Sequence, residues 1–332
     1  MATVTGTAGD DFIHVSGDGL TPPPGTNEVA TATNGNDVIT SGAGTDIIYA
    51  GGGNDQIRIT TASDISGLAE YIDGGSGNDF LSLACGGTID LTLVTFVSVY
   101  AINGSSGLDF PNVIMTAEQI STMQLTNANF FLNAPGAVSY QQQGFSGALT
   151  GSSGDDVLDF RTEGTFTING AGGNDMILAT EQRGSVTLYG GTGNDTIEAG
   201  KKSDTLDGGD GVDFLIGGRG KDKLTGGLDA DTFVFRQDRD SKVGGSDRIT
   251  DFSHAQGDLI DLSKIDANTG LPKDQAFHLG GAVFTKMAGE LIQTIDANGN
   301  TLLQGDTNGD GIADFALQIA GGPTLVESDF IF

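Results

Sequence analysis

Aspartate recurs at the sixth position of a nine-residue repeat, and this spacing is the clearest chemical feature of the chain. Five consecutive repeats between Gly190 and Val234 read GGTGNDTIE, AGKKSDTLD, GGDGVDFLI, GGRGKDKLT and GGLDADTFV. The sixth residue of each repeat is Asp, and the eighth is large and apolar. Hard divalent cations prefer oxygen ligands such as carboxylates, so the spacing predicts repeated cation binding.

The same repeat occurs in other parts of the chain. A second run covers residues 32–58, and single copies begin at Gly6, Gly74, Gly151 and Gly170. The aspartates at position 6 are Asp11, Asp37, Asp46, Asp55, Asp79, Asp156, Asp175, Asp195, Asp204, Asp213, Asp222 and Asp231. A flexible Gly/Asp-rich linker would not keep an apolar residue two places after Asp, so the pattern predicts folded structure.

The repeat has the form G-G-x-G-x-D-x-U-x, where U is a large apolar residue, and this form is typical of calcium-binding parallel β-helices. Glycine suits the turn in the first six residues because its backbone accepts positive φ. The residues around position 8 are predicted to form a short strand whose apolar side chain points inward. Two repeats complete one coil, so residues about 18 apart stack at roughly 4.8 Å.

Stacking of this kind predicts two opposed columns of carboxylates. Asp195, Asp213 and Asp231 fall in one column, and Asp204 and Asp222 fall in the other. Carboxylates so close repel each other unless a cation lies between them. Oxygen-only ligands with backbone carbonyls in reach select Ca²⁺ over Zn²⁺ or Mg²⁺. The predicted fold class is therefore all-β, a right-handed parallel β-roll or β-solenoid that binds several Ca²⁺ ions.

Composition excludes several classes of partner. Among 332 residues, 44 are acidic and 15 are basic, which gives a formal net charge of −29. Such a surface repels nucleic acid and anionic lipid. The single Cys85 excludes an intramolecular disulfide and a Cys-rich zinc site. No apolar stretch is long enough to span a bilayer, and the first residues lack the basic and apolar regions of a cleaved secretory signal.

The repeats also predict how the chain is organised. Residues 1–235 are expected to form the solenoid, and residues 236–332 a separate C-terminal domain in which the period stops and Lys and Arg become common. Between residues 83 and 150 the Asp motif nearly vanishes while apolar alternation continues, which predicts coils without metal. The predicted metal-binding coils are 6–14, 32–58, 74–82, 151–178 and 190–234.

The repeats resemble those of the RTX (repeats-in-toxin) family, whose β-rolls bind Ca²⁺ between successive turns. The resemblance implies that one turn supplies its Asp and the carbonyls of positions 2 and 4. The following turn supplies its own Asp and the carbonyls of positions 1 and 3. Three implied ligand sets are Gly191, Gly193, Asp195, Gly208, Asp210 and Asp213; Gly200, Lys202, Asp204, Gly217, Arg219 and Asp222; and Gly209, Gly211, Asp213, Gly226, Leu228 and Asp231.

In the first run the same resemblance implies one ion between Asp37 and Asp55. Its further ligands would be the carbonyls of Thr33, Gly35, Ala50 and Gly52. Additional candidate ligands are Asp46, Asp79, Asp156 and Asp175. Two repeats depart from the family pattern, since one has AGKK in place of GGxG and another has Asp229 in place of the fourth glycine. Sites that use these two repeats are expected to be weaker.

Residues 231–332 resemble the C-terminal domain of serralysin-type secreted metalloproteases, of peptidase family M10. The stretches that carry the resemblance are DRITDFSHAQGDLIDLSKID, GDTNGDGIADFALQIAG and the ending Asp329, Phe330, Ile331 and Phe332. The resemblance implies a small β-sandwich-like cap with the signal for type I secretion. An ABC transporter would then be a partner during export, and the protein would work outside the cell or at its surface.

A possible further metal site lies in the C-terminal segment. Asp306, Asn308, Asp310 and Asp314 have the spacing of an EF-hand-type loop, with glycine at the sixth place. The twelfth place is Leu317, whereas an EF-hand loop has a bidentate Glu there. A metal-binding loop and a tight Asn/Gly hairpin are therefore equally compatible with these residues.

Catalytic motifs are missing from the sequence. The three histidines, His14, His254 and His278, are too far apart for H-E-x-x-H, and Ser146 in GFSGA lacks the last glycine of G-x-S-x-G. The hypothesis is therefore a non-enzymatic structural protein of a surface layer, biofilm matrix or adhesin. Its partners would be further copies of itself or a cell-surface polysaccharide. The alternative is an extracellular polysaccharide-modifying enzyme or an accessory module of a secreted hydrolase.

Overall fold

A computed structural model describes residues 2–16, 18–65, 67–85, 88–104, 112–116, 119, 124–126, 128–132, 139–142, 147–160, 165–180 and 184–332. The chain divides into two compact units. The first consists of Met1–Ala134 and Gln142–Thr150, and the second of Pro135–Gln141 and Gly151–Phe332. Among the described residues, no helix is long and apolar enough to cross a membrane.

Parallel strands dominate the first unit, as the repeats predict. One sheet has the order β1 (Thr3–Thr5), β4 (Val38–Thr40), β6 (Gln56–Ile59), β8 (Asp79–Leu83), β11 (Val99–Gly104) and β13 (Gln124–Thr126). Another has the order β10 (Thr95–Val97), β7 (Tyr71–Asp73), β5 (Ile47–Tyr49), β2 (Asp11–Val15) and β3 (Asn27–Ala32). A further series pairs β9 (Thr88–Asp90), β12 (Asn112–Met115), β14 (Ala128–Leu132) and β16 (Gly147–Thr150). A short 3-10 helix, η1 (Ala62–Asp64), follows β6.

Apolar residues in register build the core of the first unit, at position 8 within the repeats and at matching places in the strands outside them. Val4, Ile39, Ile57, Leu81 and Ile102 lie in register on successive strands, and all are buried. Each strand residue on either side of them points to the other face of the sheet. The predicted inward stack of apolar side chains is therefore confirmed here. The described part of 83–150, where coils without metal are predicted, contains the strands β9 to β16.

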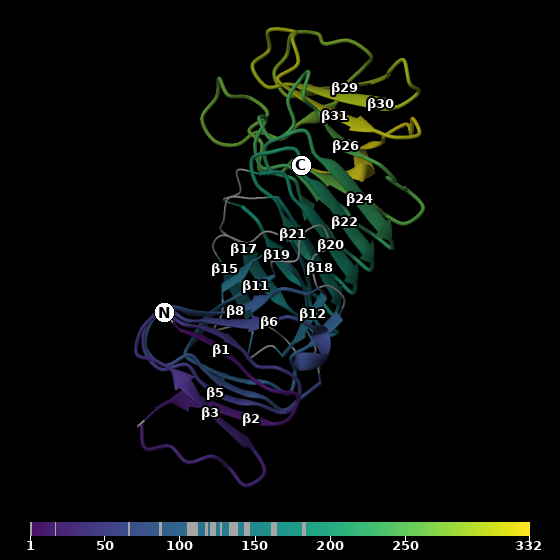
Figure 1. Cartoon of the computed structure of the whole chain (residues 1–332). Helices are drawn as coiled ribbons and strands as arrows, with labels where there is room; N and C mark the ends of the chain where they lie inside the picture. The colour runs from purple at the N-terminus through teal and green to yellow at the C-terminus, as the bar shows by residue number, and fades with distance from the viewer. Residues whose placement is uncertain are drawn as a thin grey trace. The chain divides into compact units, whose positions relative to one another are not determined.

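The second unit contains the longest run of repeats. One sheet has the order β18 (Phe166–Gly172), β20 (Thr187–Thr192), β22 (Thr205–Asp210), β24 (Lys223–Leu228), β26 (Asp247–Ile249), β31 (Phe315–Ile319), β30 (Thr301–Asp306), β29 (Glu290–Ile295) and β28 (His278–Leu279). The other contains β17 (Val157–Phe160), β19 (Met176–Leu178), β21 (Thr196–Glu198), β23 (Phe214–Ile216), β25 (Thr232–Val234), β27 (Leu259–Asp261) and β32 (Phe330–Ile331). β15 spans Ser139–Gln142 and η2 spans Glu327–Asp329. Figure 1 shows β18, β20, β22 and β24 side by side.

The register of these strands confirms a coil of two repeats. Leu188 pairs with Leu206, and Leu206 pairs with Leu224, so neighbouring turns are 18 residues apart. In the run from Gly190 the turns pack so closely that a position-2 residue such as Gly209 has no room for a side chain. Gly209 has φ of +109°, and a Cβ placed on it would lie 2.0 Å from the carbonyl oxygen of Gly191. A side chain there would therefore clash and would strain the backbone.

The C-terminal segment adds strands to both sheets of the second unit. β26 pairs with β24, and β27 pairs with β25, each in parallel. Beyond them the antiparallel strands β29, β30 and β31 extend the first sheet. Phe235, at the end of the repeats, is buried against Phe315 with ring centroids 5.5 Å apart. Residues 236–332 are thus packed directly on the last turns of the roll.

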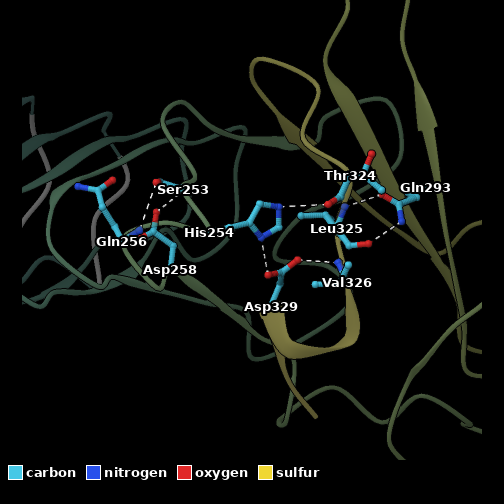
Figure 2. A network of polar contacts seen from close by, with 9 residues as sticks. All are labelled: Ser253, His254, Gln256, Asp258, Gln293, Thr324, Leu325, Val326 and Asp329. Atoms are coloured by element: carbon cyan, nitrogen blue, oxygen red, sulfur yellow. Dashed lines mark hydrogen bonds and ion pairs between the residues drawn. The ribbon is translucent and has the colours of Figure 1, made fainter.

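The end of the chain is held by polar contacts, which Figure 2 shows around the ring of His254. His254 Nδ1 lies 2.7 Å from Oδ1 of Asp329, and His254 Nε2 lies 3.1 Å from the carbonyl oxygen of Thr324. The backbone N–H of Val326 donates to Oδ2 of Asp329 at 2.6 Å. Gln293 exchanges two hydrogen bonds with the backbone of Leu325. The last strand, β32, is therefore fixed against the body of the unit.

Candidate metal centres

Most position-6 aspartates link two successive turns, because their Oδ1 atom accepts a backbone N–H from the turn before. In the second unit, the backbone N–H of Asp156 donates to Oδ1 of Asp175 at 2.8 Å, and that of Asp175 donates to Asp195 at 2.7 Å. The N–H of Asp195 donates to Oδ1 of Asp213 at 2.8 Å, and the N–H of Asp213 donates to Asp231 at 3.0 Å. The structure therefore forms the predicted column and extends it upstream to Asp156.

The opposite column has the same arrangement. The N–H of Asp204 donates to Oδ1 of Asp222 at 2.8 Å, and the N–H of Asp222 donates to Oδ1 of Asp247 at 2.8 Å. The first unit likewise has such a column. The backbone N–H of Asp37 donates to Oδ1 of Asp55, and the N–H of Asp55 donates to Oδ1 of Asp79, both at 2.7 Å. Carboxylates predicted to stack are thus brought together in both units.

The second carboxylate oxygen is buried without a hydrogen-bond partner in most of these residues. This is true of the Oδ2 atoms of Asp46, Asp55, Asp79, Asp175, Asp195, Asp213, Asp222, Asp231 and Asp247. A buried polar atom without a partner costs roughly 1–3 kcal/mol, and a charged one costs more. So many unpaired carboxylate oxygens indicate that a bound cation completes the structure.

In the long run of the second unit, glycine at position 1 lets the free Oδ2 approach the backbone closely, in space that a side chain would otherwise fill. A Cβ placed on Gly190 would lie 2.2 Å from Oδ2 of Asp195 and 2.5 Å from the carbonyl oxygen of Gly208. A Cβ on Gly208 would lie 2.1 Å from Oδ2 of Asp213 and 2.6 Å from the carbonyl oxygen of Gly226. The carboxylate of one turn and the position-1 carbonyl of the next therefore converge. This donor set fits Ca²⁺, which takes carboxylate and carbonyl oxygens.

The carbonyls of positions 2 and 4 differ from that of position 3 in what they contact. The carbonyl oxygens of Gly191 and Gly193 point toward the next turn, each 2.0 Å from where a Cβ on Gly209 or Gly211 would lie. The position-3 carbonyl of Asp210, in contrast, accepts the N–H of Gly193 at 2.8 Å. A position-3 carbonyl therefore already has one protein partner and would offer an ion only its second lone pair.

The AGKK repeat differs from its neighbours in the way its aspartate is satisfied. Oδ2 of Asp204 accepts the N–H of Gly200 at 3.3 Å, so it is not left unpaired. The carbonyl of Gly200 in turn accepts the N–H of Arg219 at 2.9 Å, while the carbonyl of Lys202 points toward Gly220. Asp204 therefore has fewer free oxygens than its neighbours, and weaker ion binding at this repeat stays a prediction.

A hydroxyl residue at position 2 supplies partners to the aspartate of its own repeat. The N–H of Thr33 donates to Oδ2 of Asp37 at 2.6 Å, and its hydroxyl donates to Oδ1 at 3.0 Å. Ser152 contacts Asp156 in the same way, at 2.7 and 2.8 Å. The N–H and the hydroxyl of Thr7 likewise donate to the carboxylate of Asp11. These three aspartates each stand at the first turn of a column, so the protein itself provides the donors there.

Burial raises the pKa values of many of the stacked carboxylates, because the charged form loses hydration. For Asp37 burial acts in the same direction, but hydrogen bonds from Ala2 and Thr33 outweigh it and lower the pKa. The pKa rises to about 7 for Asp175, Asp213 and Asp231. For Asp222, burial and then the charge of Asp247 raise the pKa to about 9. In the absence of a cation these groups therefore favour the protonated state near neutral pH.

No group of three or more His, Cys, Asp or Glu side chains gathers as a metal cluster in the described part of the chain. Any ion must therefore use at most two carboxylates together with backbone carbonyls. Such a set is poorly suited to Zn²⁺, which is held by three or four His, Cys or carboxylate side chains. It is well suited to Ca²⁺.

The loop at 306–314 connects β30 to β31 as an antiparallel hairpin. Oδ1 of Asp306 accepts the N–H of Asn308 and of Gly309, at 3.1 and 2.7 Å, and its Oδ2 accepts the N–H of Gly311 at 2.8 Å. Asp314 accepts the side-chain amide of Asn308 at 3.1 Å. Asp310 accepts the N–H of the residue two places further on. The hairpin is present, and metal binding in it stays a prediction.

Three acidic residues continue the columns although they lie outside the repeats identified from the sequence. Asp247 follows Asp222, and Asp258 accepts the N–H of Asp231 at 3.2 Å. Glu70 follows Asp46 and is buried. Each is followed two places later by isoleucine, which is the signal that could have revealed them.

A comparison with protein families matches the RTX calcium-binding nonapeptide repeat at residues 25–57, 67–82, 189–224, 200–233 and 207–241. The molecule is therefore a parallel β-solenoid with stacked carboxylate columns. Its repeats are RTX calcium-binding repeats, and they occur in both compact units. No curated protein matches the chain.

Replacing Asp213 should weaken calcium binding more than replacing Asp11. Asp213 stands in the middle of a column with a free Oδ2, whereas Asp11 is already satisfied by Thr7. We expect Asp213→Asn to raise the Ca²⁺ midpoint about tenfold, equivalent to about 1.4 kcal/mol. Asp11→Asn should change it less than about twofold, which is about 0.4 kcal/mol. Calorimetric titration of both variants measures this, and equal midpoints would contradict the stacked geometry.

Proposed function

We propose that this chain is an exported calcium-binding protein that folds as it binds Ca²⁺ after type I secretion and has a structural role outside the cell. The observation that carries the proposal is the set of buried, unpaired Oδ2 atoms in successive turns. RTX repeats are typical of secreted proteins, which supports the location. Candidate settings are a surface layer, a biofilm matrix or an adhesin.

Calcium concentration would control when the chain folds. Extracellular calcium modules bind Ca²⁺ at about 10⁻⁴–10⁻³ M, far above cytosolic levels. Inside the cell the buried carboxylates would have no cation, and a chain of net charge −29 would resist compaction. Outside, binding and folding would occur together, as in other metal-dependent modules.

The place of the C-terminus in the fold supports export before folding. β32 pairs with β27, and Asp329 and Phe330 are buried. A transporter that recognises these last residues would reach them only in the unfolded chain. Calcium-dependent folding outside the cell would then bury the signal and make the step one-way.

A structural role is supported by an exposed apolar strand edge in the first unit. β10 is the last described strand of its sheet. On β10 itself Val97 is 37% exposed, and Leu93, two residues before the strand, is 57% exposed. Open strand edges are templates for pairing with another chain. Further copies of the protein or a cell-surface polysaccharide are the proposed partners, and enzymatic activity is not part of the proposal.

Export can be tested in cells that carry a type I transporter. We expect the full-length chain in the medium, and a variant lacking residues 329–332 to stay in the cells, with at least a tenfold lower secreted fraction. Asp296→Asn, in an exposed turn that also holds its carboxylate by local hydrogen bonds, serves as the matched control and should be exported normally. Immunoblotting of medium and lysate gives the fractions.

Equal secretion of the shortened and full-length chains would overturn the export signal. The structural role has its own readout, because the secreted protein should scatter light strongly in millimolar Ca²⁺ and lose that signal with chelator. A chain that stays monomeric in Ca²⁺ and cleaves an extracellular polysaccharide would replace the structural role with the enzymatic one.

A further inference from the structure

Glu70 occupies a position equivalent to the repeat aspartates. β5 and β7 are parallel, with Ile47 paired to Tyr71, so Glu70 lies directly beside Asp46 on the next turn. The N–H of Tyr71 donates to the carbonyl of Asp46 at 3.0 Å, which fixes this register. The residues ISGLAEYID place Glu70 sixth and Ile72 eighth, directly before the repeat that begins at Gly74. Glu70 therefore continues the column of Asp46.

Both carboxylates are buried and incompletely partnered. Glu70 is 1% exposed, and neither its Oε1 nor its Oε2 accepts a hydrogen bond of normal geometry. Asp46 is 0% exposed, and its Oδ2 is also unpaired. Three buried carboxylate oxygens without a hydrogen bond of normal geometry thus lie on two adjacent turns, and the backbone N–H of Asp46 is the donor nearest to satisfying Glu70. Such groups stay buried only when they are neutralised or paired with a cation.

The surroundings of the pair are negative. The charged groups that act on Glu70 and Asp46 are Asp10, Asp11 and Asp64, all acidic. The carboxylate of Asp64 already accepts the N–H of Thr61 at 3.0 Å. It therefore does not need the cation that Glu70 and Asp46 would bind. Among the described residues, the charged groups named as acting on the pair include no basic side chain. The site is therefore electrostatically complementary to a divalent cation.

We propose that Asp46 and Glu70 bind one Ca²⁺ ion between their turns, with Glu70 contributing both carboxylate oxygens and Asp46 its Oδ2. The inference deepens the proposed function, on which it rests for the identity of the ion. A bidentate Glu is a common Ca²⁺ ligand, and backbone carbonyls can complete the shell. The ion would tie the turn after the insertion at 60–69, which contains η1, to the coil before it.

Counting bound ions in the full-length chain tests the site. Calcium per chain would be measured by equilibrium dialysis at saturating Ca²⁺ for wild type and Glu70→Gln, which keeps the shape and removes the charge. We expect one ion fewer in Glu70→Gln. Glu28→Gln changes the same chemistry on an exposed strand of the same sheet and should keep the wild-type number.

Terbium luminescence gives a second measurement that does not disturb the ligands. Tyr71 adjoins Glu70, and its ring lies 5.3 Å from that of Tyr49, so light absorbed there should excite Tb³⁺ bound at this site. Tyr71→Phe should lower tyrosine-sensitised Tb³⁺ emission while leaving the Ca²⁺ count unchanged. This variant keeps both carboxylates, so it stays informative if Glu70→Gln fails to fold.

The outcomes separate this inference from the proposed function. If wild type binds no Ca²⁺, the proposed function fails. If wild type binds Ca²⁺ and Glu70→Gln binds the same number, only the Asp46–Glu70 site is overturned, and Glu70 is instead a buried neutral acid. Unchanged Tb³⁺ emission in Tyr71→Phe would overturn it as well. One ion fewer with weaker emission supports it.

Discussion

Removing Ca²⁺ at neutral pH should unfold the coils of residues 190–234. A ligand present at 100 times its Kd stabilises the native state by about 2.7 kcal/mol per site. Loss of the three ions implied for these coils would remove about 8 kcal/mol, comparable to the roughly 5–15 kcal/mol that holds a typical domain. Far-UV circular dichroism with a chelator should therefore lose its β signal, and the thermal transition should disappear.

Two controls make this prediction specific. Restoring Ca²⁺ should restore the β spectrum, whereas an equal concentration of Mg²⁺ should not, because Mg²⁺ demands a near-ideal octahedral shell and keeps its waters. A spectrum and a melting temperature unchanged by chelation would show that the columns are stable without metal. The calcium-coupled folding proposed above would then be wrong.

Acidification should have opposite effects on the calcium-free and the calcium-loaded protein. Burial raises the pKa of Asp175, Asp213 and Asp231 to about 7, so the folded state holds protons more tightly than the unfolded state, where Asp titrates near 4. The stability that these groups contribute is therefore fully present below about pH 4 and is lost as the pH rises through about 7. The metal-free chain should fold better at pH 5 than at pH 8.

With Ca²⁺ bound, acidification should instead lower the stability of the folded chain, because protons compete with the ion for the same oxygens. The measurement is the melting temperature of dialysed protein at pH 5 and pH 8, with and without 1 mM Ca²⁺, which is about the Kd of weak extracellular sites. Without Ca²⁺ the melting temperature should be higher at pH 5, and with Ca²⁺ it should be higher at pH 8. Substituting both Asp213→Asn and Asp231→Asn should flatten the metal-free pH dependence. Parallel pH curves with and without Ca²⁺ would contradict a shared site for protons and calcium.

Much of the solenoid follows from local pattern. Leu206 and Leu224 are two repeats apart in the sequence, and they pair in register as the 18-residue coil predicts. The columns through Asp195, Asp213 and Asp231 follow from the same spacing. A repeat of constant length allows only one way to stack its apolar residues inward, so here sequence periodicity is enough.

The state of each carboxylate depends on neighbours that periodicity does not describe. Asp37 and Asp213 stand at the same repeat position, yet Thr33 donates to Asp37 while Oδ2 of Asp213 has no partner. A hydroxyl at position 2 decides this difference, and its effect depends on the geometry of the turn. The sequence could place both residues in a column but could not tell which oxygen stays free.

Insertions between turns also had to be resolved by the tertiary structure. Asp79 follows Asp55 in its column after 24 residues, and Asp247 follows Asp222 after 25, so a fixed period of 18 misses these links. The sequence by itself determined the β-solenoid, its inward apolar stack and its calcium-binding repeats. Tertiary structure decided that Glu70 and Asp247 join the columns, because an insertion changes the spacing along the chain while strand pairing restores the contact in space.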